Sequence, residues 1–265
     1  MGFGVIIIGD EILSGRRQDK HLSKAIELLG QRGGSLSWAR YVGDDPALIE
    51  TTLREAIDGS DVVFSFGGIG ATPDDHTRAC AARALGRPLL LHPQAEALIL
   101  ERSREMLAEE GRTLDLADPD IIRRLDMGRF PEGAHIIPNP YNKIPGFSLL
   151  GRVHFLPGFP VMAWPMMAWV LDTQHADVLG VARQPEKSVI VLDGLESRLT
   201  PLMQKVEALH PGIKVFSLPS VDHPQFGKHI DLGVKGAAEL IEPAFQTLIE
   251  GLHELGAKLG PEMVR

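Results

Sequence analysis

The chain has 265 residues, of which 44% are hydrophobic and 23% are charged, and its mean hydropathy is +0.00, as in ordinary globular proteins. These proportions exclude a disordered, collagen-like or coiled-coil protein. With 27 Lys and Arg against 35 Asp and Glu, the net charge is −8, so no nucleic-acid partner is expected, while a small anionic ligand is allowed. Cys80 is the only cysteine and has no partner for an internal disulfide, which favours a reducing compartment.

The first ten residues have no cationic segment, and their apolar run ends at Asp10, so a signal peptide is not expected. The longest uncharged stretch, residues 155–171, is shorter than a bilayer span of roughly 20 residues and is interrupted by prolines. The sequence therefore predicts no membrane span, and by elimination a cytoplasmic location.

The first third of the chain alternates strand and helix patterns. Residues 5–8, 36–42 and 61–66 are predicted strands, and the first of these is a continuous β-branched run, which is typical of a strand covered on both faces. Asp19 is a predicted cap for a helix over residues 22–29, and Asp45 with Pro46 predicts the start of a second helix. This order predicts right-handed parallel crossovers, and hence an α/β fold of the three-layer α/β/α sandwich type with a mostly parallel sheet.

The rest of the chain is less regular. Residues 93–127 are helical in pattern with a break at Gly111, and we expect them to cover one face or to form an arm. Two more strands are predicted at residues 136–137 and 153–156, separated by a loop with three prolines. Residues 180–187 are a predicted linker, which gives domains at 1–175 and 186–265. The second is predicted to be a small α+β domain with strands at 188–192, 213–217 and 229–234, a helix opened by Thr200 and Pro201, and a helix over 237–255.

A glycine-rich turn after the third strand is the most informative stretch. Gly67, Gly68 and Gly70 lead to Thr72, Pro73, Asp74, Asp75 and Thr77, so backbone N–H groups at a helix start are available to hold phosphate. Helix capping alone is the competing interpretation: Thr72 would be the cap, Pro73 the first helical residue and Asp75 the acid of a capping box. Capping does not explain two adjacent carboxylates beside three glycines.

Asp10 and Glu11 follow the first strand, so they are expected at the same edge of the sheet as the glycine turn. Together with Asp75 they are the predicted metal ligands, since clustered carboxylates suit Mg²⁺, Mn²⁺ or Co²⁺ bridging to phosphates. The alternative is that Asp10 caps a turn and Glu11 is solvated. The candidate phosphate partners are cationic: Arg16, Arg17, Lys20, Arg78 and, in the proline-rich loop, Lys143.

These motifs, in this order, resemble the molybdenum-cofactor-biosynthesis (molybdopterin-binding) domain family. Within the family, the branch of the N-terminal part of competence/damage-inducible protein A is most similar, because Asn139, Gly146 and Gly158 with their neighbouring prolines recur there. The resemblance covers residues 1 to 172, and more weakly the following small domain. The chain ends before the amidohydrolase domain of longer members, so deamidation of nicotinamide mononucleotide is not expected.

The resemblance implies a three-layer domain that binds a pterin or a nucleotide phosphate as a dimer or trimer. Some relatives hydrolyse the pyrophosphate of ADP-ribose or FAD with a divalent cation, and others adenylylate molybdopterin. Carried over to this chain, Asp74 and Asp75 would be catalytic. The ligand would contact Gly67, Gly68, Gly70, Thr72, Thr77, Asn139, Lys143, Gly146 and Gly158.

Three hypotheses follow for the function. The first is a metal-dependent hydrolase of a nucleotide pyrophosphate, and the second is a molybdopterin adenylyltransferase-like role. The third is a non-catalytic module that binds a pterin or nucleotide, because residues 161–164 are apolar where relatives carry polar residues.

Overall fold

The structure is a computed structural model that describes residues 2–180 and 185–264. The chain divides into two compact units, residues 1–181 and 182–265. Part of the predicted linker, residues 181–184, lies outside the described residues, and its last two residues belong to the first strand of the second unit.

A six-stranded sheet forms the centre of the first unit, in the order β2-β1-β3-β8-β7-β6. Its strands are β1 (Phe3–Ile8), β2 (Leu36–Val42), β3 (Val62–Phe66), β6 (His135–Ile137), β7 (Gly146–Leu149) and β8 (Val153–Leu156). The pairs of β1 with β2, β1 with β3 and β3 with β8 are parallel, whereas β7 and β6 add antiparallel. The prediction of a mostly parallel sheet is therefore confirmed.

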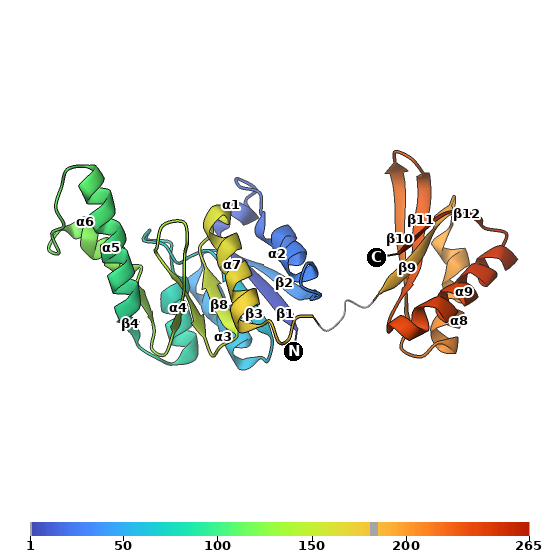
Figure 1. The fold of residues 1–265 in the computed structure, drawn as a ribbon, viewed down its shortest axis with the longest axis horizontal. Coiled ribbons are helices and arrows are strands. Elements are labelled where there is room, and N and C mark those ends of the chain that lie inside the picture. The colour runs from blue at the N-terminus through green and yellow to red at the C-terminus, as the bar shows by residue number, and fades with distance from the viewer. Residues whose placement is uncertain (1, 181–184, 265) are drawn as a thin grey trace. The chain divides into compact units, whose positions relative to one another are not determined.

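Helices cover both faces of this sheet (Figure 1). Ile6 and Ile8 of β1 pack with α3 (Pro46–Asp58) and α4 (Thr77–Leu85). Val5 and Ile7, the alternate residues, pack with α2 (His21–Gly30) and α7 (Pro160–Gln174). Since successive residues of a strand point to opposite faces, the continuous apolar run of β1 serves both layers.

The predicted caps fix where two helices begin. The Asp45 carboxylate accepts hydrogen bonds from the N–H groups of Ala47 and Leu48 at 2.8 and 3.0 Å. The Asp19 carboxylate accepts from His21 and Leu22 at 2.8 and 3.1 Å, which anchors the start of α2. These bonds satisfy N–H groups that have no partner within the helix.

The helical segment after α4 forms an arm that extends from the sandwich (Figure 1). It consists of α5 (Pro93–Glu109) and α6 (Pro119–Asp126), and the two-stranded sheet of β4 (Leu89–Leu91) and β5 (Arg129–Pro131) lies at its base. Gly111 follows the end of α5 with φ +68°, which confirms the predicted break.

The second unit is a four-stranded antiparallel sheet with two helices, in the order β10-β11-β9-β12. The strands are β9 (Glu186–Leu192), β10 (Lys214–His223), β11 (Gly227–Lys235) and β12 (Lys258–Val264), and the helices are α8 (Glu196–Leu209) and α9 (Ala238–Glu254). The predicted start of α8 at Thr200 is wrong, because the apolar face of the helix includes Leu199 as well as Leu202 and the helix begins at Glu196.

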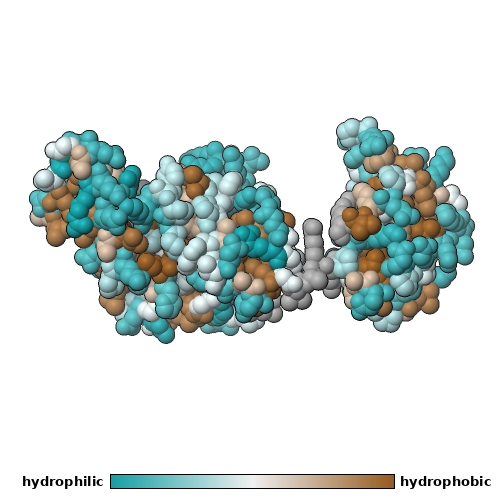
Figure 2. All heavy atoms as spheres, in the orientation of Figure 1, coloured by the Kyte–Doolittle hydropathy of each residue, from teal (hydrophilic) through white to brown (hydrophobic). Residues whose placement is uncertain are grey.

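Across the described residues, none of the helices combines the length and the apolar character needed to span a bilayer. The face drawn in Figure 2 mixes hydrophilic and hydrophobic residues in small patches.

Candidate functional site

Polar and glycine residues follow the carboxyl ends of all four parallel strands of the first unit. Residues 9–11 follow β1, residues 43–44 follow β2, residues 67–70 follow β3, and residues 157–159 follow β8. Two cavities open at this edge. The location agrees with the general rule that ligands of open α/β sheets bind outside the carboxyl ends of the strands.

The larger cavity, here called the glycine-loop cavity, has a volume of about 380 Å³. It is lined by Gly67, Gly68, Ile69, Gly70, Ala71 and Thr72, by the acids Glu11, Asp44, Asp74 and Asp75, by Arg17, and by residues 157–159. The cavity thus joins the two sequence motifs that were predicted to share one edge of the sheet.

The glycine loop turns sharply because two of its residues have left-handed backbone angles. Gly67 has φ +99° and Gly68 has φ +68°. A Cβ atom on Gly67 would lie 2.4 Å from the Ile8 carbonyl oxygen, and one on Gly68 would lie 2.1 Å from Thr77 Oγ1. Only glycine meets both demands.

Three residues of the same loop line the cavity and have backbone N–H groups without a protein acceptor among the described residues. In the part of the chain that the structure describes, the N–H groups of Gly68, Ile69 and Ala71 donate to no protein acceptor. Thr77 is fully buried, and its hydroxyl donates to the Gly67 carbonyl at 3.0 Å, so it shapes the loop from behind. Successive backbone N–H groups in a glycine turn are suited to bind an anion.

Gly68→Ala is expected to destabilise the protein by about 2–4 kcal/mol, because a left-handed φ and a clash with Thr77 both oppose the methyl group. Gly111→Ala is the matched control: Gly111 has the same φ of +68° with no atom within 4 Å of its Cβ position, so it lacks the clash. Urea unfolding of both variants measures the difference. Equal losses would show that the glycine loop tolerates the methyl group.

The Asp75 side chain hydrogen-bonds to the glycine loop and does not cap a helix. Its carboxylate accepts hydrogen bonds from the N–H groups of Gly70 and Thr72, each at 2.8 Å, and from the Thr72 hydroxyl at 2.5 Å. The competing interpretation, in which Thr72 caps a helix beginning at Pro73, is wrong, since α4 begins at Thr77. The reason is that residues 72–75 form a turn in which the Asp75 N–H donates to the Thr72 carbonyl.

A fifth carboxylate at this edge, that of Asp44, was missed by the sequence analysis. Asp44 and Asp10 hold each other: the N–H of Asp10 donates to Asp44 Oδ2 at 2.9 Å, and the N–H of Asp44 donates to Asp10 Oδ1 at 3.1 Å. Burial raises the pKa of Asp44, and the charges of Asp10, Glu11 and Asp74 raise it further, against the lowering effect of the Asp10 N–H. Its place directly after β2 is the same signal that singled out Asp10 after β1.

The acids do not form a ready metal cage. Within residues 2–180 and 185–264, no group of three or more His, Cys, Asp or Glu side chains is arranged to hold a metal ion. Glu11, Asp44 and Asp74 line the glycine-loop cavity, whereas Asp10 is not among its lining residues. Carboxylates are therefore present where a phosphate would bind, but they are dispersed.

Among the cations predicted from the sequence, Arg17 is the one that lines the glycine-loop cavity. Arg78 is buried and donates to the carbonyls of Gly70 and Asp126, both at 2.6 Å, so it supports the loop from inside the protein. Lys143 pairs with Glu101 at 2.6 Å and with Glu105 on the arm. Lys20 lines the second cavity, and Arg16 lines neither.

The proline-rich loop also contributes less than predicted. Asn139 is buried, and its side chain donates to the Ile144 carbonyl at 2.9 Å and accepts from the Tyr141 N–H at 3.0 Å, which shapes the loop itself. Gly146 begins β7, where a Cβ would lie 2.4 Å from the Phe155 carbonyl. Of the predicted contacts beyond residue 77, the structure brings only Gly158 to the cavities.

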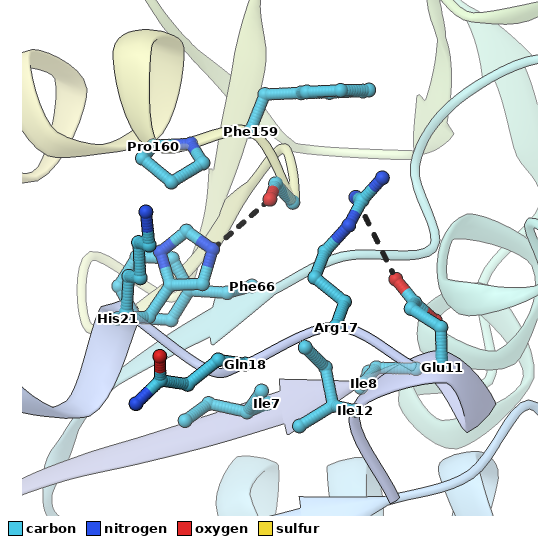
Figure 3. Close-up of a pocket in the computed structure, with 12 residues that line it drawn as sticks. Ile7, Ile8, Glu11, Ile12, Arg17, Gln18, His21, Phe66, Phe159 and Pro160 are labelled. Carbon is cyan, nitrogen blue, oxygen red and sulfur yellow. Dashed lines mark hydrogen bonds and ion pairs between the residues drawn. The ribbon is translucent and has the colours of Figure 1, made fainter. Parts of the chain in front are cut away.

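A second cavity of about 290 Å³, here called the aromatic cavity, is drawn in Figure 3. It adjoins the first, with which it shares lining residues. The ring of His21 stacks on that of Phe66, with ring centres 4.5 Å apart and planes 19° apart. Ile7, Ile12, Phe159 and Pro160 line the rest together with Ile8, Glu11, Arg17, Gln18, Lys20 and Gly158.

His21 is a neutral part of this aromatic cavity. Its side chain is almost completely buried, and burial lowers its pKa. Nε2 lies 3.1 Å from the Gly158 carbonyl, and because a carbonyl only accepts, Nε2 carries the proton. His21 was not singled out from the sequence, because it lies inside an ordinary amphipathic helix pattern.

The chain is similar to known proteins in sequence and in fold. A CinA-like protein of Syntrophotalea carbinolica is 34% identical over 217 residues, which cover 78% of this chain and 50% of the relative. A CinA-like protein of Mycobacterium tuberculosis is 29% identical over 222 residues, which cover 81% of this chain and 51% of the relative. The chain therefore spans about half the length of these curated relatives.

Among solved structures, the protein CinA of unknown function from Thermoplasma acidophilum matches with a TM-score of 0.54 and 28% identity, over 65% of this chain and 97% of that chain. The family model described as a probable molybdopterin binding domain matches residues 4–180. That match includes the six-stranded sheet, the glycine loop and both cavities. The chain thus belongs to the family of probable molybdopterin-binding domains.

Proposed function

We propose that the first unit hydrolyses the pyrophosphate bond of a nucleotide of the ADP-ribose or FAD type with the help of a divalent cation. The observation that carries the proposal is the glycine-loop cavity, which is lined both by loop residues with N–H groups unpaired within the described chain and by the acids Glu11, Asp44 and Asp74. The family description, a probable molybdopterin binding domain, supports a pterin ligand, and the nucleotide is part of the proposal.

The donors of the loop suit the transition state of phosphoryl transfer. Negative charge spreads over the phosphoryl oxygens in that state, and N–H groups fixed in place stabilise it without reorganising. Gly68, Ile69 and Ala71 would supply these donors. Asp74 is exposed at the cavity and has the oxygen atoms needed to orient a water molecule and accept its proton as the phosphorus–oxygen bond of the anhydride breaks.

A hard divalent cation fits the acids of this cavity on chemical grounds. Mg²⁺ is commonly held by one or two carboxylates together with substrate phosphates, so a complete protein cage is not required. Glu11 and Asp44 would hold the cation, which would neutralise phosphate charge. Burial raises the pKa of Asp44 and the charges of Asp10, Glu11 and Asp74 raise it further, and a cation beside them would offset that negative charge. Asp10 supports Asp44, and Asp75 supports the loop with both of its oxygens.

The engagement of Asp75 also favours a second candidate, a module that binds a pterin or nucleotide without catalysis. A carboxylate whose two oxygens both accept hydrogen bonds from its own loop serves to shape a binding site. Adenylyl transfer to molybdopterin would use the same cavity, and its product differs from that of hydrolysis. A dimer or trimer, as the family resemblance implies, is part of the proposal and is tested by light scattering of the purified chain.

The test is AMP release from ADP-ribose, FAD, NAD and an adenylylated pterin, each with Mg²⁺, Mn²⁺ or Co²⁺ and with EDTA. Hydrolysis predicts AMP release that depends on the cation and is abolished by EDTA. Binding without turnover by wild-type protein would support the module instead, and neither binding nor turnover would overturn the proposal.

A further inference from the structure

We propose that Arg17 and Phe159 bind one ligand across both cavities, with its phosphates at the glycine loop and its planar heterocycle in the aromatic cavity. The ligand class is therefore a nucleotide whose ring and phosphates contact the same edge of the sheet. The inference rests on the proposed function only in that the glycine loop holds phosphate.

The two cavities adjoin each other and share five lining residues. Glu11, Arg17, Gly158 and Phe159 line both of them, together with Ile8 at the end of β1. The volumes of about 290 and 380 Å³ are each at the small end of the range for ligand sites. One extended ligand thus fits the pair better than either cavity alone.

Charge selects Arg17 as the residue that contacts phosphate. Of the described residues that line the glycine-loop cavity, four are acids and Arg17 is the one Lys or Arg. An anion that enters this cavity meets repulsion from the carboxylates, and a guanidinium offers two parallel donors to a phosphate. A bound cation and Arg17 would share the neutralisation of a diphosphate.

Arg17 is free to move to such a ligand. Its guanidinium lies 3.9 Å from the Glu11 carboxylate, a long contact, and the side chain is 56% exposed. The Arg32 pair with Asp172 shows the contrast, with two nitrogen–oxygen distances of 2.6 and 2.9 Å. Loose exposed pairs contribute little stability, so exchanging Glu11 for a phosphate costs little.

The aromatic cavity offers flat apolar surfaces to a ring. The stacked rings of His21 and Phe66 form one wall, and His21 is neutral there. Phe159 is 53% exposed, with the Arg17 guanidinium 5.7 Å from its ring centre, and Figure 3 shows Arg17 standing between Phe159 and Glu11. A heterocycle that stacks on the exposed Phe159 ring buries apolar surface that otherwise faces solvent at the mouth of the cavity.

Calorimetric titration of the full chain with ADP and with inorganic pyrophosphate, both with Mg²⁺, tests the inference. Arg17→Ala is expected to weaken both probes by about 10- to 100-fold, the effect of losing a charged hydrogen bond. Phe159→Ala is expected to weaken ADP about 10-fold and to leave pyrophosphate unchanged. Arg16→Ala is the matched control, since Arg16 is the exposed neighbouring arginine that lines neither cavity.

The outcomes separate this inference from the proposed function. If wild-type protein binds both probes and Arg17→Ala binds them as tightly as Arg16→Ala does, Arg17 does not hold phosphate, while the site itself stands. If Phe159→Ala weakens both probes equally, the ring does not occupy the aromatic cavity. If wild-type protein binds neither probe, the site and the inference both fail.

Discussion

Asp75→Asn is expected to lower cation-dependent AMP release by about 100-fold or more. The Asp75 carboxylate accepts hydrogen bonds from Gly70 and Thr72 through both of its oxygens. Asparagine has one acceptor oxygen, and its NH₂ group, itself a donor, would face one of these donor groups. Losing charged hydrogen bonds costs about 1.5–3 kcal/mol each, and about 2.7 kcal/mol in the transition state is a factor of 100 in rate. The loop would then present its N–H groups in the wrong positions.

Steady-state AMP release and calorimetric binding are the measurements for this variant. Asp58→Asn is the matched control, because Asp58 is an exposed aspartate at the end of α3 that lines neither cavity. Activity of Asp75→Asn within threefold of that control would contradict the role given to Asp75. A loss of turnover with unchanged binding would instead make Asp75 part of the chemistry itself.

Acid is expected to destabilise the first unit through two buried histidines. His154 is fully buried between Ser148 Oγ at 2.8 Å and His175 Nε2 at 2.8 Å, and burial lowers its pKa to about 3. Burial lowers the pKa of His175 as well. Because the unfolded chain binds protons near the ordinary pKa of about 6.5 and the folded chain does not, stability is complete above pH 6.5 and falls as the pH drops.

His154 alone is expected to remove about 2–3 kcal/mol of unfolding free energy between pH 6.5 and pH 4.5. Urea unfolding at several pH values measures this slope. His154→Gln is expected to be less stable at pH 7 but to show a shallower slope, since glutamine hydrogen-bonds without titrating. His135→Gln, at an exposed histidine of β6, is the control. An unchanged slope in His154→Gln would show that the buried pair does not set the acid response.

The parallel sheet, and the edge of it at which the candidate site lies, could be predicted because the sequence signals for both are local. The β-branched run of β1, the Asp45 and Pro46 start of α3 and the glycine turn after β3 each lie within a few consecutive residues. Their consequences follow from the rule that carboxyl ends of parallel strands meet at one edge. By that rule the sequence alone predicts Glu11 beside the glycine loop, and both line the same cavity.

Pairing across the chain explains what the sequence could not predict. Lys143 was a candidate phosphate partner, but it lies beside two glutamates of α5 that are 38 and 42 positions away. Arg78 is buried, and its guanidinium donates hydrogen bonds to the carbonyls of Gly70 and Asp126. α4 begins at Thr77 because the Asp75 carboxylate accepts hydrogen bonds from the preceding loop and does not cap a helix. This loop contains the same residue types as a capping box, so the sequence alone does not distinguish the two.

The central claim is that a phosphate of the ligand binds the free N–H groups of the glycine loop. The most direct measurement is an amide NMR titration of the labelled chain with ADP and Mg²⁺. The account predicts that the largest shifts fall on the amides of Gly68, Ile69 and Ala71, with smaller shifts at Gly158 and Phe159. Saturable shifts confined to other parts of the chain, with these amides unmoved, would contradict it.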